Sequence, residues 1–494
     1  MGRELESATF TREQRQLYRD KVKACLDVFE QMLATRFFDF DEPMIGMEIE
    51  LNLVDVDYQP KLDNAEVLAA IADPEYQTEL AQFNIEFNVA PRQISGSSMA
   101  ELEGSLRASL NQAEQRCAQV GAHIVMIGIL PTVMPETFEG EWMSANARYQ
   151  ALNDAFLAAR GENIHLDIPG RSGDHLVRYA DSLAPESACT SMQLHLQVRP
   201  HEFAPYWNAA QVLAGAQLAL GANSPYFLGH ELMAETRVEL FHQAADTRPE
   251  ELRNQGVRPR VFFGDRWITS IFDLFEENAL YFPALLPELD EEDPQQALDA
   301  GRAPKLAEMR LHNGTIYRWN RPIYDIVAGR PHLRVENRVL PAGPTIVDTL
   351  ANAAFYYGTV RALVADDRPV WSRMSFATAR ENFNAGARDG IDALQFWPGR
   401  GDIPASELVL RDLLPMAHEG LHAWGVEAAV SDRLLGIIEQ RCLTGQNGAA
   451  WQVATVRALE SRGLTRTDAL REMVARYASH MHSNEPVHTW EVLG

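Results

Sequence analysis

Cysteine is scarce in this chain of 494 residues, which contains only four. Cys25, Cys117, Cys189 and Cys442 are scattered along the chain and show no paired spacing. A disulfide framework or a zinc site built from thiolates would need cysteines at regular, paired spacings. We therefore expect reduced thiols and a cytoplasmic protein.

Positive charge is also in short supply: 44 Lys and Arg stand against 69 Asp and Glu, which leaves a formal net charge of −25. Proteins that bind nucleic acid or anionic membranes through charge alone need a basic surface. The charge balance therefore disfavours both kinds of partner. It is compatible with small-molecule substrates, because an anionic substrate needs only a local cluster of arginines or a metal, and it leaves homo-oligomer formation open.

Long apolar runs and the common nucleotide-binding motifs are missing too. The longest apolar runs, near 124–130 and 212–222, are too short or too interrupted to span a bilayer. The opening segment MGRELESATFTREQRQ has no apolar core and is not expected to act as a signal peptide. Neither GxxxxGK[ST] nor a convincing GxGxxG after a strand occurs, so nucleotide binding would have to use metal and arginine instead of a phosphate loop.

What the sequence does contain is four short segments that combine an apolar face with a polar one. Side chains on a β-strand alternate between its two faces. In residues 46–53 this alternation places Ile49 and Leu51 on one face, and Glu48 and Glu50 on the other. The segments 83–89, 191–198 and 333–339 have polar faces made, in turn, of Asn84, Glu86 and Asn88; Gln193, His195 and Gln197; and Arg334, Glu336 and Arg338.

A solvent-exposed polar face would explain any one of these strands. Four such strands in one chain instead favour a single shared polar concavity. Two carboxylates about 5 Å apart repel by roughly 3 kcal/mol at an effective dielectric constant near 20, so such a site needs protons or cations. Carboxylate oxygens with one imidazole suit Mg²⁺ or Mn²⁺. Such metals neutralise the phosphate groups during phosphoryl transfer from ATP. Arg334 and Arg338 could each contact two phosphate or carboxylate oxygens at once.

The remaining pattern predicts mainly helices. Apolar residues at helical spacing predict helices over 11–36, 64–72, 97–122, 148–160 and 207–221. We expect a buried strand over 123–130, a loop-rich insertion over 161–185, and strand-like segments over 261–264, 311–321 and 333–340. From residue 345 onward the pattern is wholly helical. We therefore predict a catalytic domain over 1–345 and a helical C-terminal subdomain, packed on it, over 346–494.

Several histidines and arginines outside the four strands have two interpretations. His312, Arg318 and Arg321 could contact nucleotide or an acyl phosphate, but ordinary strand and loop packing is favoured. Near the end of the chain, a flexible or surface tail explains the three histidines better than a metal site does; these are His480, His482 and His488.

Five segments, taken in order, resemble the glutamate–cysteine ligase family, and in particular its bacterial carboxylate–amine ligase branch. They are GMEIELNLVD, the strand around Glu86, CTSMQLHLQV, ANSPYFLGHELMAETRVELFHQ and LRVENRVLPAGP, and the resemblance spans about residues 45–350. It implies an α+β fold in which a curved, mainly antiparallel sheet of the glutamine-synthetase catalytic type, flanked by helices, forms a funnel that holds ATP and metals. It also implies amide formation through a γ-glutamyl phosphate with release of ADP and phosphate, cysteine as the usual amine, and a place in glutathione biosynthesis.

The resemblance also implies roles for single residues. Arg334 looks like a catalytic phosphate contact, with Arg338 as a second contact to the nucleotide. Gln193 and Arg237 look like substrate-binding residues, with Arg237 on the substrate's α-carboxylate, although a helix-surface arginine explains Arg237 equally well. The fourth strand reads Arg-Val-Glu-Asn-Arg where many relatives have Glu-Val-Arg. The implied metal ligands are Glu48, Glu50 (also catalytic), Glu86, His195 and Glu336.

The sequence thus favours an ATP- and Mg²⁺-dependent ligase, with Mn²⁺ as a second option for the metal. Two alternatives stay open. One is a phosphotransferase of the same fold that acts on a guanidino or carboxylate group. The other is a relative that binds nucleotide and metal without turnover.

Overall fold

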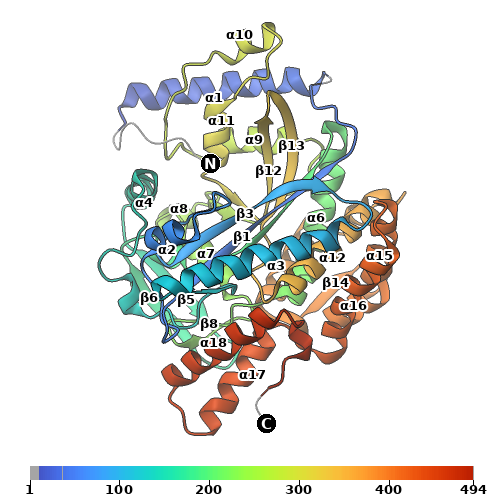
Figure 1. Cartoon of the computed structure of the whole chain (residues 1–494). Helices are drawn as coiled ribbons and strands as arrows, with labels where there is room; N and C mark the ends of the chain where they lie inside the picture. Colours follow the sequence, from blue (N-terminus) through green and yellow to red (C-terminus); the bar gives the residue numbers. More distant parts are fainter. Residues whose placement is uncertain (1–9, 36, 493–494) are drawn as a thin grey trace.

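The structure of the protein is a computed structural model that describes residues 10–35 and 37–492. Its centre is one curled antiparallel sheet with the strand order β12-β13-β7-β1-β3-β2, and β4 pairs with β1 (Figure 1). This confirms the predicted fold class. The strands of the sheet are β1 (Met44–Val54), β2 (Tyr76–Thr78), β3 (Asn84–Gln93), β4 (His123–Val125), β7 (Met192–Gln197), β12 (Asn320–Val327) and β13 (Arg330–Asn337).

The four segments with polar faces become β1, β3, β7 and β13, which are adjacent in the sheet. Each neighbouring pair is antiparallel. Because residues that lie opposite each other in such a pair point to the same face, the four polar faces combine into one surface. The shared concavity that the sequence predicts therefore has a structural basis.

The apolar face of the sheet is covered by α3 (Ser98–Cys117) and α12 (Ile346–Ala365) (Figure 1). Ile49 and Leu51 of β1 are fully buried there. Met47 of β1 lies close to residues of both helices around a small gap. In addition, the hydroxyl of Tyr357 in α12 donates to the backbone oxygens of Gly46 (3.2 Å) and His195 (3.0 Å). Strands β1 and β7 are thus held to a helix from the C-terminal part of the chain.

The remaining elements surround this core (Figure 1). α1 packs on α9, α10 and α11. The α-helices and strands not yet given are α1 (Arg12–Leu33), α2 (Asn64–Ile71), α4 (Ala147–Arg160), β5 (Ile164–Pro169), β6 (His175–Ala180), α5 (Ala184–Ser187), α6 (Pro200–Gly221), β8 (Tyr226–Phe227), β9 (His230–Glu231), α7 (Thr236–Ala244), α8 (Glu250–Asn254), β10 (Val261–Phe262), α9 (Ile271–Tyr281), α10 (Pro294–Asp299), α11 (Ala307–Asn313), β11 (Tyr317–Arg318), α13 (Phe376–Asp389), β14 (Leu394–Trp397), β15 (Gly401–Pro404), α14 (Ala405–Leu408), α15 (Leu414–Ala423), α16 (Ala428–Thr444), α17 (Gly448–Ser461) and α18 (Arg466–Ser483).

Several local predictions are wrong. The segment 161–185 is not a loop-rich insertion, because β5 and β6 form a hairpin in which Leu166 and Ile168 alternate inward and are fully buried. The strand expected over 311–321 begins inside α11, where Met309 and His312 are buried at helical spacing. The strand expected over 123–130 ends at Val125. The C-terminal part is not wholly helical, since β14 and β15 pair as a hairpin.

The terminal histidines do not lie in a flexible or surface tail. The ring of His480 stacks on Trp490 at 4.9 Å, and Trp490 meets Trp451 edge-on at 5.1 Å. Nε2 of His482 lies 3.7 Å from Oε2 of Glu114. The C-terminal helices therefore pack through aromatic contacts that a helical pattern alone does not reveal.

The division into two domains at residue 345 stays a prediction. One continuous cluster of buried apolar residues extends from α1 to Trp490 and so crosses that boundary. Residues 1–9 of the opening segment and residue 36 of the first predicted helix lie outside the described residues. The part of the chain that the structure describes contains no helix with the length and apolar character that crossing a bilayer requires.

Helices α12 and α15 touch backbone to backbone, which yields a stability prediction. A Cβ atom at Gly358 would overlap the carbonyl oxygen of Ala417, whereas a Cβ atom at Gly436 in α16 would meet open space. Gly358→Ala should lower the free energy of unfolding by about 1–3 kcal/mol, because the helices must move apart. Gly436→Ala, the matched control, should change it little or raise it by up to about 1 kcal/mol, because alanine favours the helix.

Urea unfolding midpoints of the two variants measure this difference. Equal midpoints for Gly358→Ala and the wild type would contradict the close packing of α12 on α15.

Candidate active site

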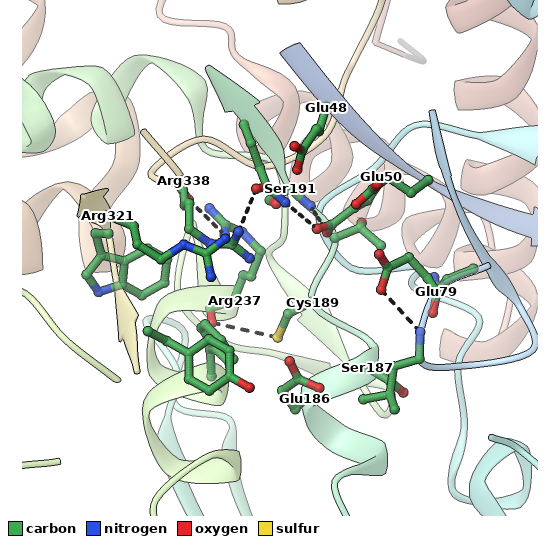
Figure 2. Close-up of a pocket in the computed structure, with 18 of the residues that line it drawn as sticks. Glu48, Glu50, Glu79, Glu186, Ser187, Cys189, Ser191, Arg237, Arg321 and Arg338 are labelled. Carbon is green, nitrogen blue, oxygen red and sulfur yellow. Dashed lines mark hydrogen bonds between the residues drawn. The ribbon is translucent and has the colours of Figure 1, made fainter. Parts of the chain in front are cut away.

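The polar faces of β1, β3 and β7 form one wall of a cavity of about 250 Å³ (Figure 2). Glu50 lies opposite Glu86 in the pair β1–β3, and Glu48 lies opposite Gln193 in the pair β1–β7. Charged side chains of both signs line this cavity. The carboxylates are Glu48, Glu50, Glu79, Glu86 and Glu186, and the guanidinium groups are Arg237, Arg318, Arg321 and Arg338.

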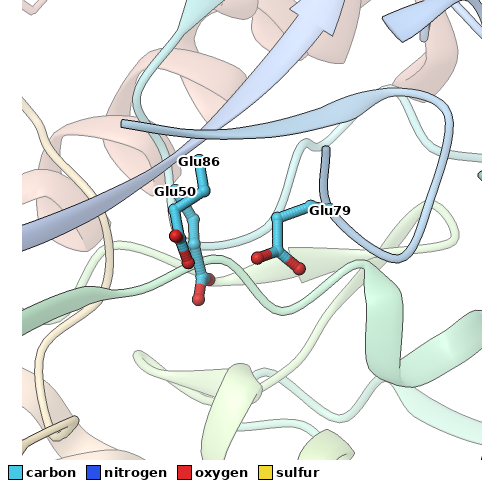
Figure 3. Close-up of side chains that lie close together, drawn as sticks. All are labelled: Glu50, Glu79 and Glu86. Atoms are coloured by element: carbon cyan, nitrogen blue, oxygen red, sulfur yellow. The ribbon is translucent and has the colours of Figure 1, made fainter. Parts of the chain in front are cut away.

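Three of the carboxylates crowd together: Glu50, Glu79 and Glu86 each place an oxygen within 4.8 Å of the others (Figure 3). Burial, together with the negative charges of Glu48 and Glu50, raises the pKa of Glu86 to about 7. Burial and the charges of Glu86 and Glu50 raise the pKa of Glu79 well above its usual value. Both causes disfavour the charged form, so this triad either holds protons or binds a cation.

The chemistry of the triad fits a hard divalent cation. All its donors are carboxylate oxygens, which Mg²⁺ and Mn²⁺ prefer. Two of its members, Glu50 and Glu86, are among the predicted ligands. The third, Glu79, directly follows the three-residue strand β2, which is too short to show the alternation that identified the others. The metal roles themselves stay predictions.

Glu50 is held in a defined orientation by its neighbours. Its Oε2 accepts from the backbone N–H of Ser191 at 2.6 Å, and its Oε1 accepts from Nε2 of Gln193 at 3.0 Å. Burial raises the pKa of Glu50, against the opposing charge of Arg338. Gln193 in turn accepts from Arg338 at 2.5 Å, so one amide links the carboxylate wall to the guanidinium wall.

Arg321 and Arg338 are anchored at the cavity by one buried carboxylate, Glu336. The Nε of Arg321 donates to Glu336 at 3.1 Å, and Nη1 of Arg338 donates to it at 2.6 Å. Despite burial, these two guanidinium groups hold the pKa of Glu336 far below its usual range. Glu336 is therefore charged and already neutralised by two arginines. Its predicted role as a metal ligand would require it to share its oxygens with them.

His195, Glu48 and Arg334 form a second polar chain on the same face of the sheet. The Nε of Arg334 donates to Nδ1 of His195 at 3.0 Å, and Nε2 of His195 lies 3.1 Å from Oε1 of Glu48. Glu48 is half-buried, and although desolvation acts in the opposite direction, the neighbouring His195 lowers its pKa below the usual value. An arginine can only donate, so Nδ1 is the acceptor and the proton of a neutral imidazole lies on Nε2.

The predicted metal role of His195 thus has a structural condition. An Nε2 that carries a proton cannot coordinate a metal. Arg334 would have to leave Nδ1 before His195 could bind a cation through Nε2. Of this chain, Glu48 lines the cavity, whereas His195 and Arg334 lie outside its lining, as does Glu336.

Arg237 lies in α7 and is buried, so its interpretation as a helix-surface arginine is wrong. Its Nε donates to Glu235 at 2.9 Å, and its Nη2 donates to the backbone oxygen of Val339. Its guanidinium carbon lies 5.4 Å from the ring centre of Trp319. These contacts hold Arg237 at the cavity wall, where it remains a candidate for binding a substrate carboxylate.

The residues for which packing was favoured divide into two cases. His312 and Arg318 are buried, and Asn278 is bonded to both: its backbone oxygen lies 2.9 Å from Nε2 of His312, and its side-chain oxygen accepts from Arg318. Arg318 and Arg321 both line the cavity, whereas His312 is not among its lining residues. Glu186 of α5 was missed because it lies just beyond the segment expected to be a loop.

Comparisons with known proteins agree with this fold. A family model described as glutamate-cysteine ligase family 2 matches residues 44–480. The solved glutamate–cysteine ligase of Francisella tularensis in complex with AMP is 12% identical, with a TM-score of 0.55 and coverage of 92% of this chain and 91% of that one. At such identity the likeness shows a shared fold alone.

Two further structures give lower TM-scores. A bifunctional glutathione synthetase from Pasteurella multocida is 13% identical with a TM-score of 0.49, and the match covers 95% of this chain and 55% of that one. The complex between the prokaryotic ubiquitin-like protein Pup and its ligase PafA gives 12% identity and a TM-score of 0.38 over 87% of this chain and 72% of that one. A search of curated proteins found no match.

The raised pKa of Glu86 predicts how pH and Mg²⁺ act together on stability. A glutamate in the unfolded chain has a pKa of about 4.3, whereas that of folded Glu86 is about 7. The unfolded state therefore releases its proton first, and without metal this group lowers the stability of the fold as pH rises from about 4.5 to about 7. Because a metal binds the deprotonated carboxylate, stabilisation by Mg²⁺ should grow over the same range.

Thermal unfolding with EDTA and with Mg²⁺, between about pH 5 and pH 8, measures both trends. Glu86→Gln should weaken the pH dependence of the Mg²⁺ effect, whereas Glu66→Gln, at an exposed position of α2, should behave as the wild type. A stabilisation by Mg²⁺ that is independent of pH would count against the triad as its binding site.

Proposed function

The chain belongs to glutamate-cysteine ligase family 2, and from this membership and the charges of the cavity we propose that it is an ATP-dependent carboxylate–amine ligase. The proposed reaction joins the side-chain carboxylate of glutamate, or of a similar acid, to an amine such as that of cysteine. ATP supplies the driving force, and ADP and phosphate are released.

One observation carries the proposal: a triad of carboxylates and a group of anchored arginines line the same cavity. Phosphoryl transfer needs a site where cations neutralise the phosphates and donors hold the transferred group. Among the described residues, no hydrogen bond occupies Nη1 of Arg321 or Nη2 of Arg338. These donors are therefore available to phosphate or carboxylate oxygens.

Glu50, Glu79 and Glu86 would hold Mg²⁺, which when bound neutralises phosphate charge and favours attack at phosphorus. The protein's own groups bind and orient the reactants. Arg321 and Arg338 contact the oxygens of the phosphoryl group or of the acid, and Arg237 contacts the α-carboxylate of the acid. The side-chain amide of Gln193 is hydrogen-bonded to both Glu50 and Arg338, and so it fixes the position of this carboxylate relative to this guanidinium group.

The chemistry then takes two steps. In the first, a carboxylate oxygen of the acid attacks the γ-phosphorus of ATP, the bond to the bridging oxygen breaks, and ADP leaves with that electron pair. In the second, the neutral amine attacks the carbonyl carbon of the acyl phosphate, phosphate leaves, and the amine nitrogen loses a proton. Holding the reactants in line is the main contribution expected from the protein. The walls also limit the access of water to the acyl phosphate.

Two further parts of the proposal concern the setting of the protein. Cys25, Cys117, Cys189 and Cys442 are all free thiols, which fits a reducing compartment such as the cytoplasm. A role in glutathione biosynthesis would follow if glutamate and cysteine prove to be the substrates.

The direct test supplies glutamate, cysteine, ATP and Mg²⁺ and measures ADP release together with the mass of the product. We expect ADP release that requires both amino acids, and an amide as the product. A stable phosphorylated product would instead indicate a phosphotransferase. If ATP raises the melting temperature but no pair of pooled amino acids releases ADP, the protein binds nucleotide without turnover, and the proposal fails.

Glu50→Gln tests the site itself. It should lower the rate of ADP release by about 100-fold or more, because one charged ligand of the triad is lost and the remaining groups no longer hold the metal. The variant should fold normally, since burial favours the neutral form that glutamine imitates. Glu66→Gln serves as the control; a Glu50→Gln enzyme with wild-type kcat would remove the triad from the mechanism.

A further inference from the structure

Glu186 differs from the other carboxylates of the cavity because its side chain has no partner in the part of the chain that the structure describes. Its backbone is fixed: the N–H donates to Leu183 at 3.0 Å, and the carbonyl oxygen accepts from the N–H of Cys189 at 2.9 Å. For its carboxylate, however, the described residues provide neither a hydrogen bond nor an ion pair. The short helix α5 thus presents a fixed carboxylate to the cavity (Figure 2).

Each of the other four carboxylates has an identified contact. Those of Glu50 and Glu48 are described above. Glu86 accepts from Asn88 at 2.7 Å, and Glu79 accepts from the backbone N–H of Leu80 at 3.2 Å. Glu186 is half-buried, so its carboxylate has lost part of its contact with water without gaining a partner, which is costly. An unpaired group that faces a cavity in this way indicates that the partner is a ligand.

The surroundings of Glu186 favour a small organic cation over a metal. Within the described residues, the triad around Glu50 does not include Glu186, so a divalent ion there would find fewer than three protein carboxylates. Tyr317 lies close enough for the charge of Glu186 to act on its hydroxyl, and the ring of Phe241 lies 5.1 Å from that of Tyr317, so the cavity has an aromatic wall on this side. A single carboxylate beside such a wall can accept charge-assisted hydrogen bonds from an ammonium group, which carries up to three N–H donors.

The cavity also contains positive charge, opposite in sign to that of Glu186. In Figure 2 Arg338 lies on the other side of the cavity from Glu186, and Arg237 lies between the two. A zwitterion that enters would therefore turn its carboxylate toward the arginines and its ammonium toward Glu186. Such an arrangement also distinguishes amino acids from simple diacids, because a diacid would leave the carboxylate of Glu186 unpaired.

We propose that Glu186 binds the ammonium group of a substrate, so that the cavity selects acids or amines that belong to the class of amino acids. The inference rests on the proposed function, because that function supplies two substrates that can carry such a group. The ammonium is either the α-amino group of the acid or that of the incoming amine. In both cases Glu186 determines specificity and does not take part in bond formation.

Calorimetric binding tests this proposal apart from turnover. The wild type and Glu186→Gln are titrated with L-glutamate, with glutarate, which lacks the α-amino group, and with L-cysteine, in the presence of Mg²⁺ and a non-hydrolysable ATP analogue. Glu251→Gln, at an exposed position of α8, is the matched control. Melting temperatures of all variants confirm that they fold.

If Glu186 binds the ammonium of the acid, Glu186→Gln should weaken L-glutamate binding by about tenfold or more and leave glutarate binding unchanged. If it binds the ammonium of the amine, L-cysteine binding should fall instead. Glu186→Asp, which keeps the charge, should retain part of the lost affinity, and Glu251→Gln should bind all three as the wild type does.

Unchanged binding of both amino acids in Glu186→Gln overturns the inference, and so does a wild type that binds neither of them. These results differ from a failure of the ligase proposal. That failure would show as absence of ADP release by a wild-type protein that still prefers L-glutamate to glutarate.

Discussion

The register of β1 against its two neighbours determines where the charged groups of the cavity wall lie. In this register Glu50 faces Glu86 on one side, and Glu48 faces Gln193 on the other. A shift by one residue would turn these groups toward α3 and α12 and expose Ile49 and Leu51. The apolar face therefore holds the polar face in place, because burying the apolar side chains of β1 against the helices fixes which side chains point to the cavity.

That arrangement concentrates like charges at a cost in stability. Glu86 has a raised pKa because the fold buries it beside other carboxylates, and the triad gains from a cation that the chain itself does not supply. The arginine side is arranged in the opposite way. There the single carboxylate of Glu336 binds both Arg321 and Arg338 inside the protein, so these arginines keep their position whether or not an anion is bound. One side of the cavity depends on a ligand and the other is preorganised.

The C-terminal helices belong to this arrangement. α12 packs on the apolar face of the sheet, and its Tyr357 bonds to the backbone of β1 and β7. The family match extends to residue 480, well beyond the region in which the segments of the sequence show the resemblance. The similarity therefore covers the helical part as well, although its sequence pattern points to packing and not to chemistry.

Much of the site could be predicted from the sequence because alternation along a strand is a local property. Residues such as Glu48 and Glu50, or Gln193 and His195, share a face whatever the rest of the chain does, and so the polar faces were predicted correctly. The sequence pattern was least informative for cavity residues that lie in or next to very short helices and strands. Glu79 follows a strand of three residues, and Glu186 lies in a helix of four, so neither shows a period.

Only the tertiary structure decides which of the shared-face residues meet. It places Glu79 beside Glu50 and Glu86. It also directs two arginines to Glu336, and Arg334 donates to Nδ1 of His195. The sequence by itself determined the polar faces and the acidic and basic character of the site, because both follow from residue type and period, whereas the fold class was implied by the resemblance to a family. The partners of each charge were decided by the curl of the sheet and by the loops that close over it, since contacts between distant segments depend on where those segments pack.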